Sequence, residues 1–304
     1  MIEQVITTDD GYKLQVYVWP NEHAKAWVHI NHGMAEHALR YHNFASQLVA
    51  QGYAVVAHNH RGHGNSETTQ LGCFAKQNGW AKVLSDVDVV RNTVCSTALP
   101  FYLFGHSMGS FIVQSYLRTT GRKVDGVILS GSNLQPAWLS KAGKLVAKIE
   151  QRRLGKTKSS TLLQFLSFGS FNQAFKPNRT AYDWLTRDEQ EVDKYLADPL
   201  CGFSCSTGLW HEFLGELVNL ANPKTLKRIA TNLPLLILGG TQDPVGMMGK
   251  GLPKLASLYK SIGQNKVTLK MYENARHEIL NETNHQQVYN DIINWLNDDK
   301  LNLT

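Results

Sequence analysis

The feature that most restricts how this chain can fold is the pentapeptide Gly105-His106-Ser107-Met108-Gly109. The apolar residues 101–104 before it predict a buried strand, and apolar residues at helical spacing after it predict a helix that ends near Gly121. A G-x-S-x-G segment between a strand and a helix is typical of a nucleophile elbow, in which the glycines permit a tight turn that exposes the serine hydroxyl above the sheet edge. The helix N-terminus favours negative charge at the same point. Ser107 is therefore the candidate nucleophile; the alternative is a glycine-rich turn that happens to carry an exposed serine.

Predicted strands alternate with predicted helices over most of the chain, which favours an α/β fold with a mostly parallel, doubly wound sheet. The alternation stops after Ser132, and from residue 133 to about 231 only helical patterns and loops occur. It resumes with the apolar run 235–239. We therefore expect residues 1–132 and 232–304 to form one core, and residues 133–231 to be a helical insertion between two of its strands. The predicted elements are strands at 2–7, 12–19, 26–30, 53–57, 101–104, 127–129, 235–239 and 267–272, and core helices at about 41–51, 80–95, 249–262 and 283–297.

The charge of the chain is concentrated in one segment. Lysine and arginine outnumber aspartate and glutamate by 31 to 25. The stretch from Lys141 to Lys158 alone carries seven basic residues and one acid, so the rest of the chain is balanced. A local excess of this kind does not indicate a general nucleic-acid surface, and we expect no nucleic-acid partner.

Several other classes of protein are disfavoured by the sequence. No run of 18 apolar residues predicts a transmembrane helix, and the N-terminus lacks the basic start and apolar core of a signal peptide, so we expect a cytoplasmic location. Four cysteines in 304 residues do not make a disulfide framework. Cys201 and Cys205 have no second Cys/His pair at ligand spacing, so we expect no metal. The oligomeric state is not predicted.

A serine nucleophile needs a general base, and the base needs an acid that orients it. Asp243 follows the predicted strand ending at Gly239, and His277 follows the last predicted strand, which ends at Tyr272. The order Ser, Asp, His, with each residue on a loop after a strand, matches one known arrangement of the catalytic triad. Each residue also has an ordinary interpretation, since Asp243 precedes a proline in a turn and His277 is one of 12 histidines. Taken together, we predict that Asp243 orients His277 and that His277 activates Ser107.

The tetrahedral intermediate of such a reaction needs backbone N–H groups directed at its oxyanion. One donor is expected from Met108, the residue after the nucleophile, and the other from Met34, on the loop after the third predicted strand. Gly33 permits close approach of that loop. The nearby polar residues His32, His63, His106, Glu36 and Arg61 are expected to brace these loops rather than to react.

At this point the chain resembles a known family, the monoacylglycerol lipase/lysophospholipase-like α/β-hydrolases, often classified as the serine aminopeptidase S33 type. The resemblance covers nearly the whole chain and implies an α/β-hydrolase fold, a Ser–His–Asp hydrolase without metal or cofactor, and a helical cap formed by residues 133–231. One departure is Asn59, where many members have aspartate, which implies a weaker local salt bridge to Arg61. The resemblance rests on the segments His32-Gly33-Met34-Ala35-Glu36-His37, His60-Arg61-Gly62-His63-Gly64-Asn65-Ser66, Gly105-His106-Ser107-Met108-Gly109, Asp243-Pro244-Val245 and His277-Glu278, with Asp198-Pro199-Leu200-Cys201 in the insertion.

We therefore predict a serine carboxylic ester hydrolase that acts on lipid-like monoacyl esters of the monoacylglycerol or lysophospholipid type. An aminopeptidase of the same fold is the alternative, for which Glu189, Glu191 and Asp193 could hold a substrate amine; a non-catalytic binding protein is a third. The aromatic and leucine-rich stretch 162–175 suits either an acyl-chain lid or ordinary cap packing.

Two interpretations of the basic segment remain open. The apolar residues Leu145 and Ile149 could pack on the core while the lysines and arginines are solvated, and this is the more ordinary interpretation. Alternatively, Lys141–Lys158 contacts an anionic membrane surface.

Overall fold

The structure, a computed structural model, describes residues 1–65 and 70–298. Ser66, the last residue of one segment quoted above, and residues 299–304 of the predicted core lie outside the described residues. Within those ranges, eight strands form one sheet in the order β1-β2-β4-β3-β5-β6-β7-β8. The strands are β1 (Ile2–Thr7), β2 (Lys13–Trp19), β3 (Ala26–Asn31), β4 (Tyr53–His58), β5 (Phe101–His106), β6 (Gly126–Ser130), β7 (Leu235–Gly240) and β8 (Val267–Tyr272).

The sheet is parallel from β4 to β8, and β2 runs antiparallel to both β1 and β4. Its central strands β4, β5, β6 and β7 are buried along their whole length, as parallel strands covered on both faces should be. The predicted mostly parallel, doubly wound sheet is confirmed. Strand bounds differ from those predicted by two residues or fewer, because the last residues of several strands are polar (Asn31, His58, His106).

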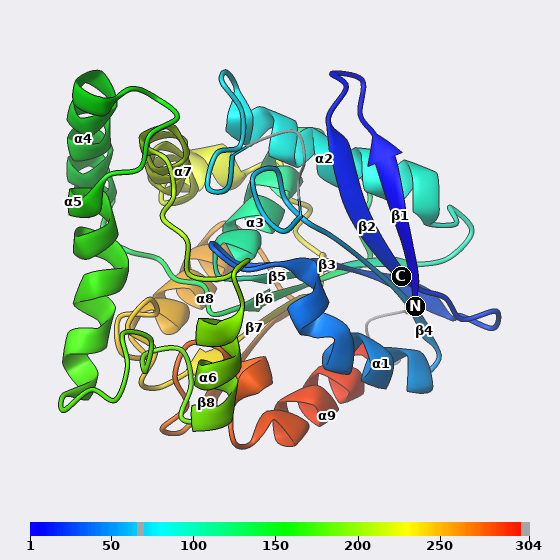
Figure 1. Cartoon of the computed structure of the whole chain (residues 1–304). Helices are drawn as coiled ribbons and strands as arrows, with labels where there is room; N and C mark the ends of the chain where they lie inside the picture. Colours follow the sequence, from blue (N-terminus) through cyan, green and yellow to red (C-terminus); the bar gives the residue numbers. More distant parts are fainter. Residues whose placement is uncertain (66–69, 299–304) are drawn as a thin grey trace.

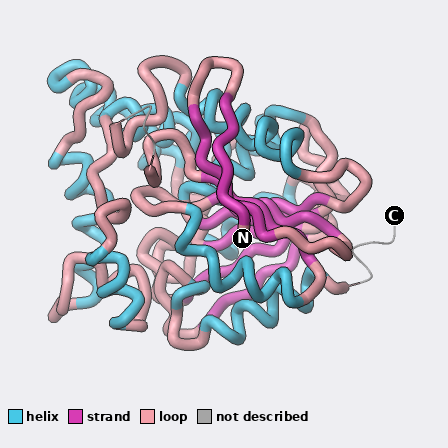
Figure 2. The backbone as a smooth tube through the Cα atoms, turned by 45° about the vertical axis from the view of Figure 1, so that its right-hand side comes forward, coloured by secondary structure: helices cyan, strands magenta, loops and turns pink. Residues whose placement is uncertain are grey.

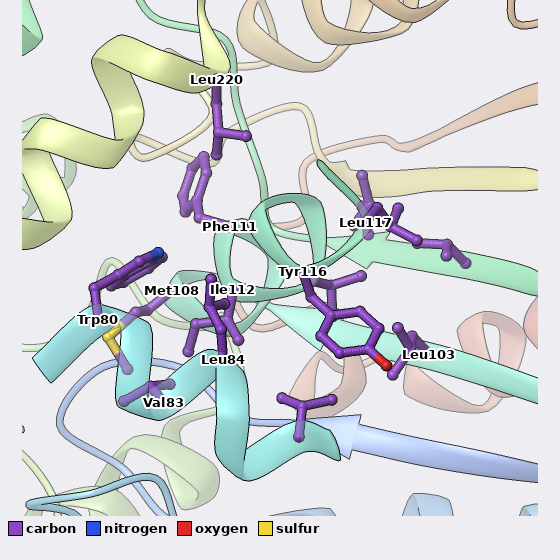
Figure 3. Packing of buried hydrophobic residues seen from close by; sticks show 14 of the residues in the cluster. Trp80, Val83, Leu84, Leu103, Met108, Phe111, Ile112, Tyr116, Leu117 and Leu220 are labelled. Atoms are coloured by element: carbon purple, nitrogen blue, oxygen red, sulfur yellow. The ribbon is translucent and has the colours of Figure 1, made fainter. Parts of the chain in front are cut away.

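Helices cover both faces of the sheet (Figure 1). On one face, α2 (Gly79–Val94), α3 (Met108–Thr120) and α8 (Gly251–Ser261) pack in one large apolar cluster, with Ile112 and Tyr116 of α3 fully buried at its centre (Figure 3). On the other face, α1 (His42–Ala50) and α9 (His285–Leu296) bury Phe44, Leu48, Val288 and Ile292 in a second cluster. The twisted strands between these two layers are visible in Figure 2. The parallel strands therefore all present their carboxyl ends at one edge, where the predicted site residues lie.

Between β6 and β7 the chain forms helices and loops, apart from one isolated bridge between Ser159 and Ser206. This segment contains α4 (Ala137–Leu154), α5 (Thr161–Gln164), η2 (Phe165–Gly169), η3 (Asn172–Phe175), α6 (Glu189–Ala197), α7 (Thr207–Leu220) and η4 (Pro223–Leu226); the remaining short helices are η1 (Ala38–Tyr41) and η5 (Ile279–Asn281). In Figure 1, α4 lies at the outer edge of the molecule, away from the sheet. Across the described ranges, no helix combines the length and apolar character needed to cross a bilayer.

The orientation of α4 corrects the ordinary interpretation of the basic segment. Leu145 and Ile149 are 60% and 54% exposed, so the predicted packing of this stripe on the core is wrong. The helix instead packs on α7 with small side chains: Ser140 and Ala147 are fully buried, and a Cβ at Gly143 would lie 3.3 Å from Leu214. Small residues let the two helices approach closely. Trp138, Leu145 and Ile149 face outward, whereas Val146 packs against the core cluster.

A second correction concerns Asn59. The expected contact with Arg61 is absent from the described residues: the guanidinium of Arg61 donates instead to Asp86 at 2.7 Å and to Asp10 at 2.8 Å. Asn59 accepts from the Ala38 N–H and donates to Gln15, both at 2.9 Å. Arg61 therefore has two carboxylate partners in this chain although residue 59 is not an aspartate.

Candidate active site

Ser107 lies at the turn between β5 and α3 in a strained backbone conformation, with φ 51° and ψ −121°. Non-glycine residues rarely adopt a positive φ, and such strain occurs mainly where function requires it. The turn also explains its glycines, because a Cβ at Gly105 would lie 2.5 Å from the Gly109 carbonyl oxygen, and one at Gly109 would collide with the carbonyl of Asn31. The Ser107 N–H donates to the Ser130 carbonyl at 2.9 Å, which fixes the backbone at the turn.

His277 and Asp243 are brought together from the loops after β8 and β7. The His277 Nδ1 atom lies 3.0 Å from both carboxylate oxygens of Asp243, and both side chains are almost completely buried. The Val245 N–H donates to the same carboxylate at 2.8 Å, which fixes its orientation. Burial lowers the pKa of His277, but the charge and hydrogen bond of Asp243 outweigh it, so the pKa is raised above 6.5. A carboxylate at Nδ1 leaves Nε2 as the nitrogen available to a reacting group.

Two glycines, Gly33 and Gly131, allow close packing around Ser107 and His277. A Cβ at Gly33 would lie 3.2 Å from the Ser107 Cβ, and a Cβ at Gly131 would lie 3.0 Å from Cε1 of His277 and 2.9 Å from Cε1 of His106. The His106 and His277 rings are 4.8 Å apart. Asp243 and His277 are therefore in contact, and His277 packs against His106, the residue that precedes Ser107 at the carboxyl end of β5.

The two predicted oxyanion donors come from the loop after β3 and from the start of α3. Met108 is the first residue of α3, and Met34 lies between Gly33 and Ala35, whose φ is 57°. Within the described residues, neither the Met34 N–H nor the Met108 N–H has a protein acceptor outside regular secondary structure. Both are suited to bind a negatively charged oxygen.

The histidines expected to brace the loops do make structural hydrogen bonds. The Nδ1 atom of His32 lies 2.7 Å from the Gly33 carbonyl, and its Nε2 accepts the His60 N–H at 3.0 Å. The Nδ1 atom of His63 lies 3.0 Å from the Arg61 carbonyl, and that of His106 lies 3.2 Å from the Ser130 hydroxyl.

A buried ion-pair network that sequence reasoning did not find links the two halves of the site. The Arg40 guanidinium donates to both carboxylate oxygens of Glu278 and to Glu36, each at 2.7 Å. Glu36 in turn accepts the Gly33 N–H at 2.5 Å and the Tyr41 hydroxyl at 2.8 Å. Burial raises the pKa of Glu278, but Arg40 outweighs it and the pKa falls, so Glu278 is ionised at neutral pH. The spacing of Glu36 and Arg40 is a helical i,i+4 signal, but nothing in the sequence points from Arg40 to Glu278.

Arg40 therefore joins the loop of Met34 to the residue beside His277, and we predict a positioning role. Arg40→Lys keeps the charge but loses the two-pronged hydrogen bond, so kcat should fall about 10- to 100-fold with little change in KM. Steady-state kinetics on a soluble ester measure both constants. Arg118→Lys, at the partly buried Arg118–Glu216 pair far from the site, is the matched control. An unchanged kcat in Arg40→Lys would contradict the role.

The cap contributes an aromatic wall beside His277. The Trp184 ring lies 5.2 Å from the His277 ring, and Phe168 stacks on Trp184 at 5.8 Å. Phe168 also approaches Trp210 at 5.9 Å, while Phe171 packs on Trp184 at 5.1 Å. Within the stretch 162–175, Phe168 and Phe171 therefore belong to this aromatic wall, whereas Leu162, Phe165 and Leu166 are exposed.

A parallel sheet with helices on both faces and a strained serine at the β5–α3 turn define a hydrolase of the α/β class. A family model described as serine aminopeptidase, S33, matches residues 22–284, and the chain belongs to this family. The resemblance seen in the sequence is confirmed, and the chain is a serine hydrolase.

The chain is 29% identical over 298 residues to the human (Homo sapiens) monoglyceride lipase, covering 97% of this chain and 89% of that protein. It is 27% identical over 289 residues to a monoacylglycerol lipase of Mycolicibacterium smegmatis, covering 94% of this chain and 93% of that protein. Among solved structures, a thermostable carboxyl esterase from Bacillus coagulans, crystallised in complex with glycerol, superposes with a TM-score of 0.89 at 24% identity and 97% coverage of both chains. This last similarity confirms the fold.

Proposed function

We propose that this chain hydrolyses lipid-like monoacyl esters, of the monoacylglycerol or lysophospholipid type, with Ser107, His277 and Asp243 as its catalytic triad. The observation that carries the proposal is the buried His277–Asp243 pair, at 3.0 Å, beside a strained serine and below an apolar wall. The monoglyceride and monoacylglycerol lipases among its relatives support the substrate class.

In this mechanism the Ser107 hydroxyl attacks the ester carbonyl and His277 Nε2 takes its proton. The Met34 and Met108 N–H groups bind the oxyanion, and His277 then protonates the departing alcohol. Water, activated by the same imidazole, attacks the acyl-enzyme and releases the fatty acid. The Asp243 carboxylate holds His277 in the required tautomer through the contact at Nδ1.

The aminopeptidase alternative receives no support from its proposed carboxylates. Arg179 pairs with Asp193 at 2.7 Å and lies 3.9 Å from Glu189, and Lys194 pairs with Glu191 at 2.6 Å. These acids are neutralised on the outside of α6 and are poorly suited to hold a substrate amine.

The test is hydrolysis of p-nitrophenyl esters from acetate to palmitate, alongside a monoacylglycerol, lysophosphatidylcholine and an aminoacyl amide. We expect a maximum at medium or long chains and no turnover of the amide. Turnover of the amide alone would replace the proposal with an aminopeptidase, and no turnover of any substrate by folded protein would favour the binding protein. A cytoplasmic location stays a prediction.

We further propose that the cap contacts an anionic membrane through the basic segment Lys141–Lys158. On α4, the exposed apolar residues Trp138, Leu145 and Ile149 are interleaved with exposed lysines and Arg152, and Leu162, Phe165 and Leu166 extend the apolar surface on α5 and η2. Apolar residues that enter the lipid interface, flanked by cations, are what membrane-surface helices require.

Replacing Lys144, Lys148 and Arg152 together by glutamine should weaken binding to vesicles containing anionic lipid by about 10-fold or more, since each cation near such a surface contributes about 1 kcal/mol. Co-sedimentation with vesicles of mixed phosphatidylserine and phosphatidylcholine measures this. The control replaces three lysines of the core, Lys254, Lys260 and Lys266, in the same way. Equal losses in both triple variants would reduce the effect to net charge and contradict a local surface.

A further inference from the structure

Three potential metal ligands meet where the loop after β3 contacts the cap. His37 comes from the loop, and Asp198 and Cys201 follow α6. The His37 Nε2 atom lies 2.7 Å from Asp198 Oδ2, and one ligand atom of each residue lies within 4.8 Å of the other two. The sequence could not indicate this group, because His37 is far from Cys201 in the chain. The expectation of no metal rested on Cys201 and Cys205, and Cys205 is buried outside the group.

The chemistry of the three side chains selects a class of ion. An imidazole nitrogen, a carboxylate oxygen and a thiolate sulfur suit Zn²⁺ and similar borderline-soft divalent cations, whereas Mg²⁺ and Ca²⁺ require oxygen ligands. With metal–ligand distances of about 2.0–2.3 Å, ligand atoms on a tetrahedral ion lie roughly 3.3–3.7 Å apart. Closure around an ion therefore needs movements of about 1 Å, and the side chains with room to make them are the half-buried Asp198 and Cys201.

The charges around the group also fit a cation. The Asp198 carboxylate accepts the Leu200 N–H at 2.8 Å through Oδ1, while its Oδ2 lies 2.7 Å from His37 Nε2. Glu278 lies near Cys201 as a further carboxylate, paired with the nearby cation Arg40. Asp198 and Cys201 are half-buried, so water can complete the coordination.

We propose that His37, Asp198 and Cys201 form a site for a zinc-type divalent cation, completed by water. Binding displaces the thiol proton of Cys201, which leaves to solvent, and His37 binds the ion through Nε2 as the tautomer that carries its proton on Nδ1. Two positive charges are then balanced by the carboxylate and the thiolate. No electrons are transferred.

The site would fasten the cap to the loop that carries Met34. The Ala35 carbonyl already accepts the Gly202 N–H at 2.9 Å and the Tyr195 hydroxyl at 3.0 Å, so the loop and the segment after α6 are in contact without metal. An ion held by both would replace the His37–Asp198 hydrogen bond with a metal bridge. The metal would thereby stabilise the closed arrangement of loop and cap, and this part of the inference alone rests on the proposed function.

The test is titration of the whole, reduced protein with Co²⁺, which reports a bound thiolate by a charge-transfer band in the near ultraviolet, followed by displacement with Zn²⁺. We expect one Co²⁺ per chain with this band, and no band in Cys201→Ser. His37→Gln and Asp198→Asn should weaken Zn²⁺ binding at least about 10-fold in competition with a chromophoric chelator.

Two controls separate this site from others. Cys95→Ser changes a buried cysteine of the core outside the group and should keep the band. Ser107→Ala should also keep it, so metal binding is tested independently of ester hydrolysis. Saturating Zn²⁺ should raise Tm by several degrees in the wild type and not in Cys201→Ser. A Co²⁺ spectrum without the thiolate band, or a band that survives Cys201→Ser, would overturn the proposal.

Discussion

Replacing Ser107 by alanine is expected to lower kcat for ester hydrolysis by at least about 10⁴-fold, because the acyl-enzyme cannot form without the hydroxyl. His277→Ala should cost about as much, and the double variant little more, since the two residues act as a unit. Asp243→Asn should cost about 10³- to 10⁴-fold, because the imidazole is left in the wrong tautomer. Initial rates on the best p-nitrophenyl ester, with active sites counted by a fluorophosphonate probe, measure these losses.

The matched control is Ser257→Ala on the exposed side of α8, which removes a serine hydroxyl bonded only to the Pro253 carbonyl within its own helix. It should retain full activity. Ser107→Ala should unfold at nearly the wild-type temperature, since the Ser107 hydroxyl has no protein hydrogen bond within the described ranges. If Ser107→Ala keeps more than about a hundredth of wild-type activity, Ser107 is not the nucleophile.

The elbow could be predicted from sequence because its geometry is local. Gly105 and Gly109 are required by close backbone contacts within a few residues of Ser107 and with the neighbouring β3, and a strand followed by a helix is a short-range pattern. The positions of Asp243 and His277 could be predicted because parallel strands deliver their following loops to one edge. The meeting of the two side chains follows from topology, although their roles stay predictions.

The orientation of α4 could not be predicted from its apolar residues. Hydrophobic periodicity assumes that the large side chains face inward, whereas α4 packs on α7 with Ser140, Gly143 and Ala147. Its inward face was visible only as small residues at spacings of three and four. The lysines and arginines beside Leu145 and Ile149 gave a better indication of an outward orientation, because burying this apolar stripe would also bury the charges on both sides of it.

The Arg40–Glu278 pair and the His37–Asp198 contact could not be predicted from the sequence for a different reason. Each joins segments more than 150 residues apart, and a charged side chain on a loop has many possible partners. Only the packing of the cap against the core selects among them.

Mild acid is expected to unfold this protein abruptly between about pH 5 and 6. The reason is that several histidines near the site are buried in the neutral form and bind protons only when the chain unfolds. His32 and His60 lie 4.2 Å apart, His58 and His60 4.9 Å, and His29 and His58 5.0 Å. Among the described residues, six almost completely buried histidines have a lowered pKa, mainly through desolvation: His29, His32, His58, His60, His63 and His106.

The direction and size of the effect follow from linkage. The folded-state pKa falls to about 3 for His58 and about 4 for His63, against 6.5 in an unfolded chain. Below pH 6.5 the unfolded state therefore binds more protons, and the free energy of unfolding falls as the pH falls. By about pH 5.5 each such histidine costs on the order of 1 kcal/mol, so six together cost several kcal/mol, compared with a total stability of roughly 5–15 kcal/mol.

Groups with a raised pKa offset part of this loss. The raised pKa of His277 contributes stability that is complete below pH 6.5 and lost at higher pH, so it offsets one of the six histidines. Burial raises the pKa of Glu36 and of Asp86, and each contributes stability that is lost as the pH rises through its folded-state pKa. The lowered pKa of Glu278 acts in the same direction as the histidines, but its loss begins only below about pH 4.5.

The measurement is tryptophan fluorescence and circular dichroism from pH 7.5 to 4.5, with urea unfolding at each pH. The stability slope near pH 5.5 should correspond to uptake of about five protons.

His60→Phe tests the assignment, because neither ring nitrogen of His60 has a hydrogen-bond partner in the described structure, so phenylalanine removes one titrating group and no hydrogen bond. Its slope should fall by about one proton. His23→Phe, at an exposed loop position, should leave the slope unchanged. A wild-type protein that stays folded at pH 5, or a slope of one proton, would mean that the buried histidines do not set its acid stability.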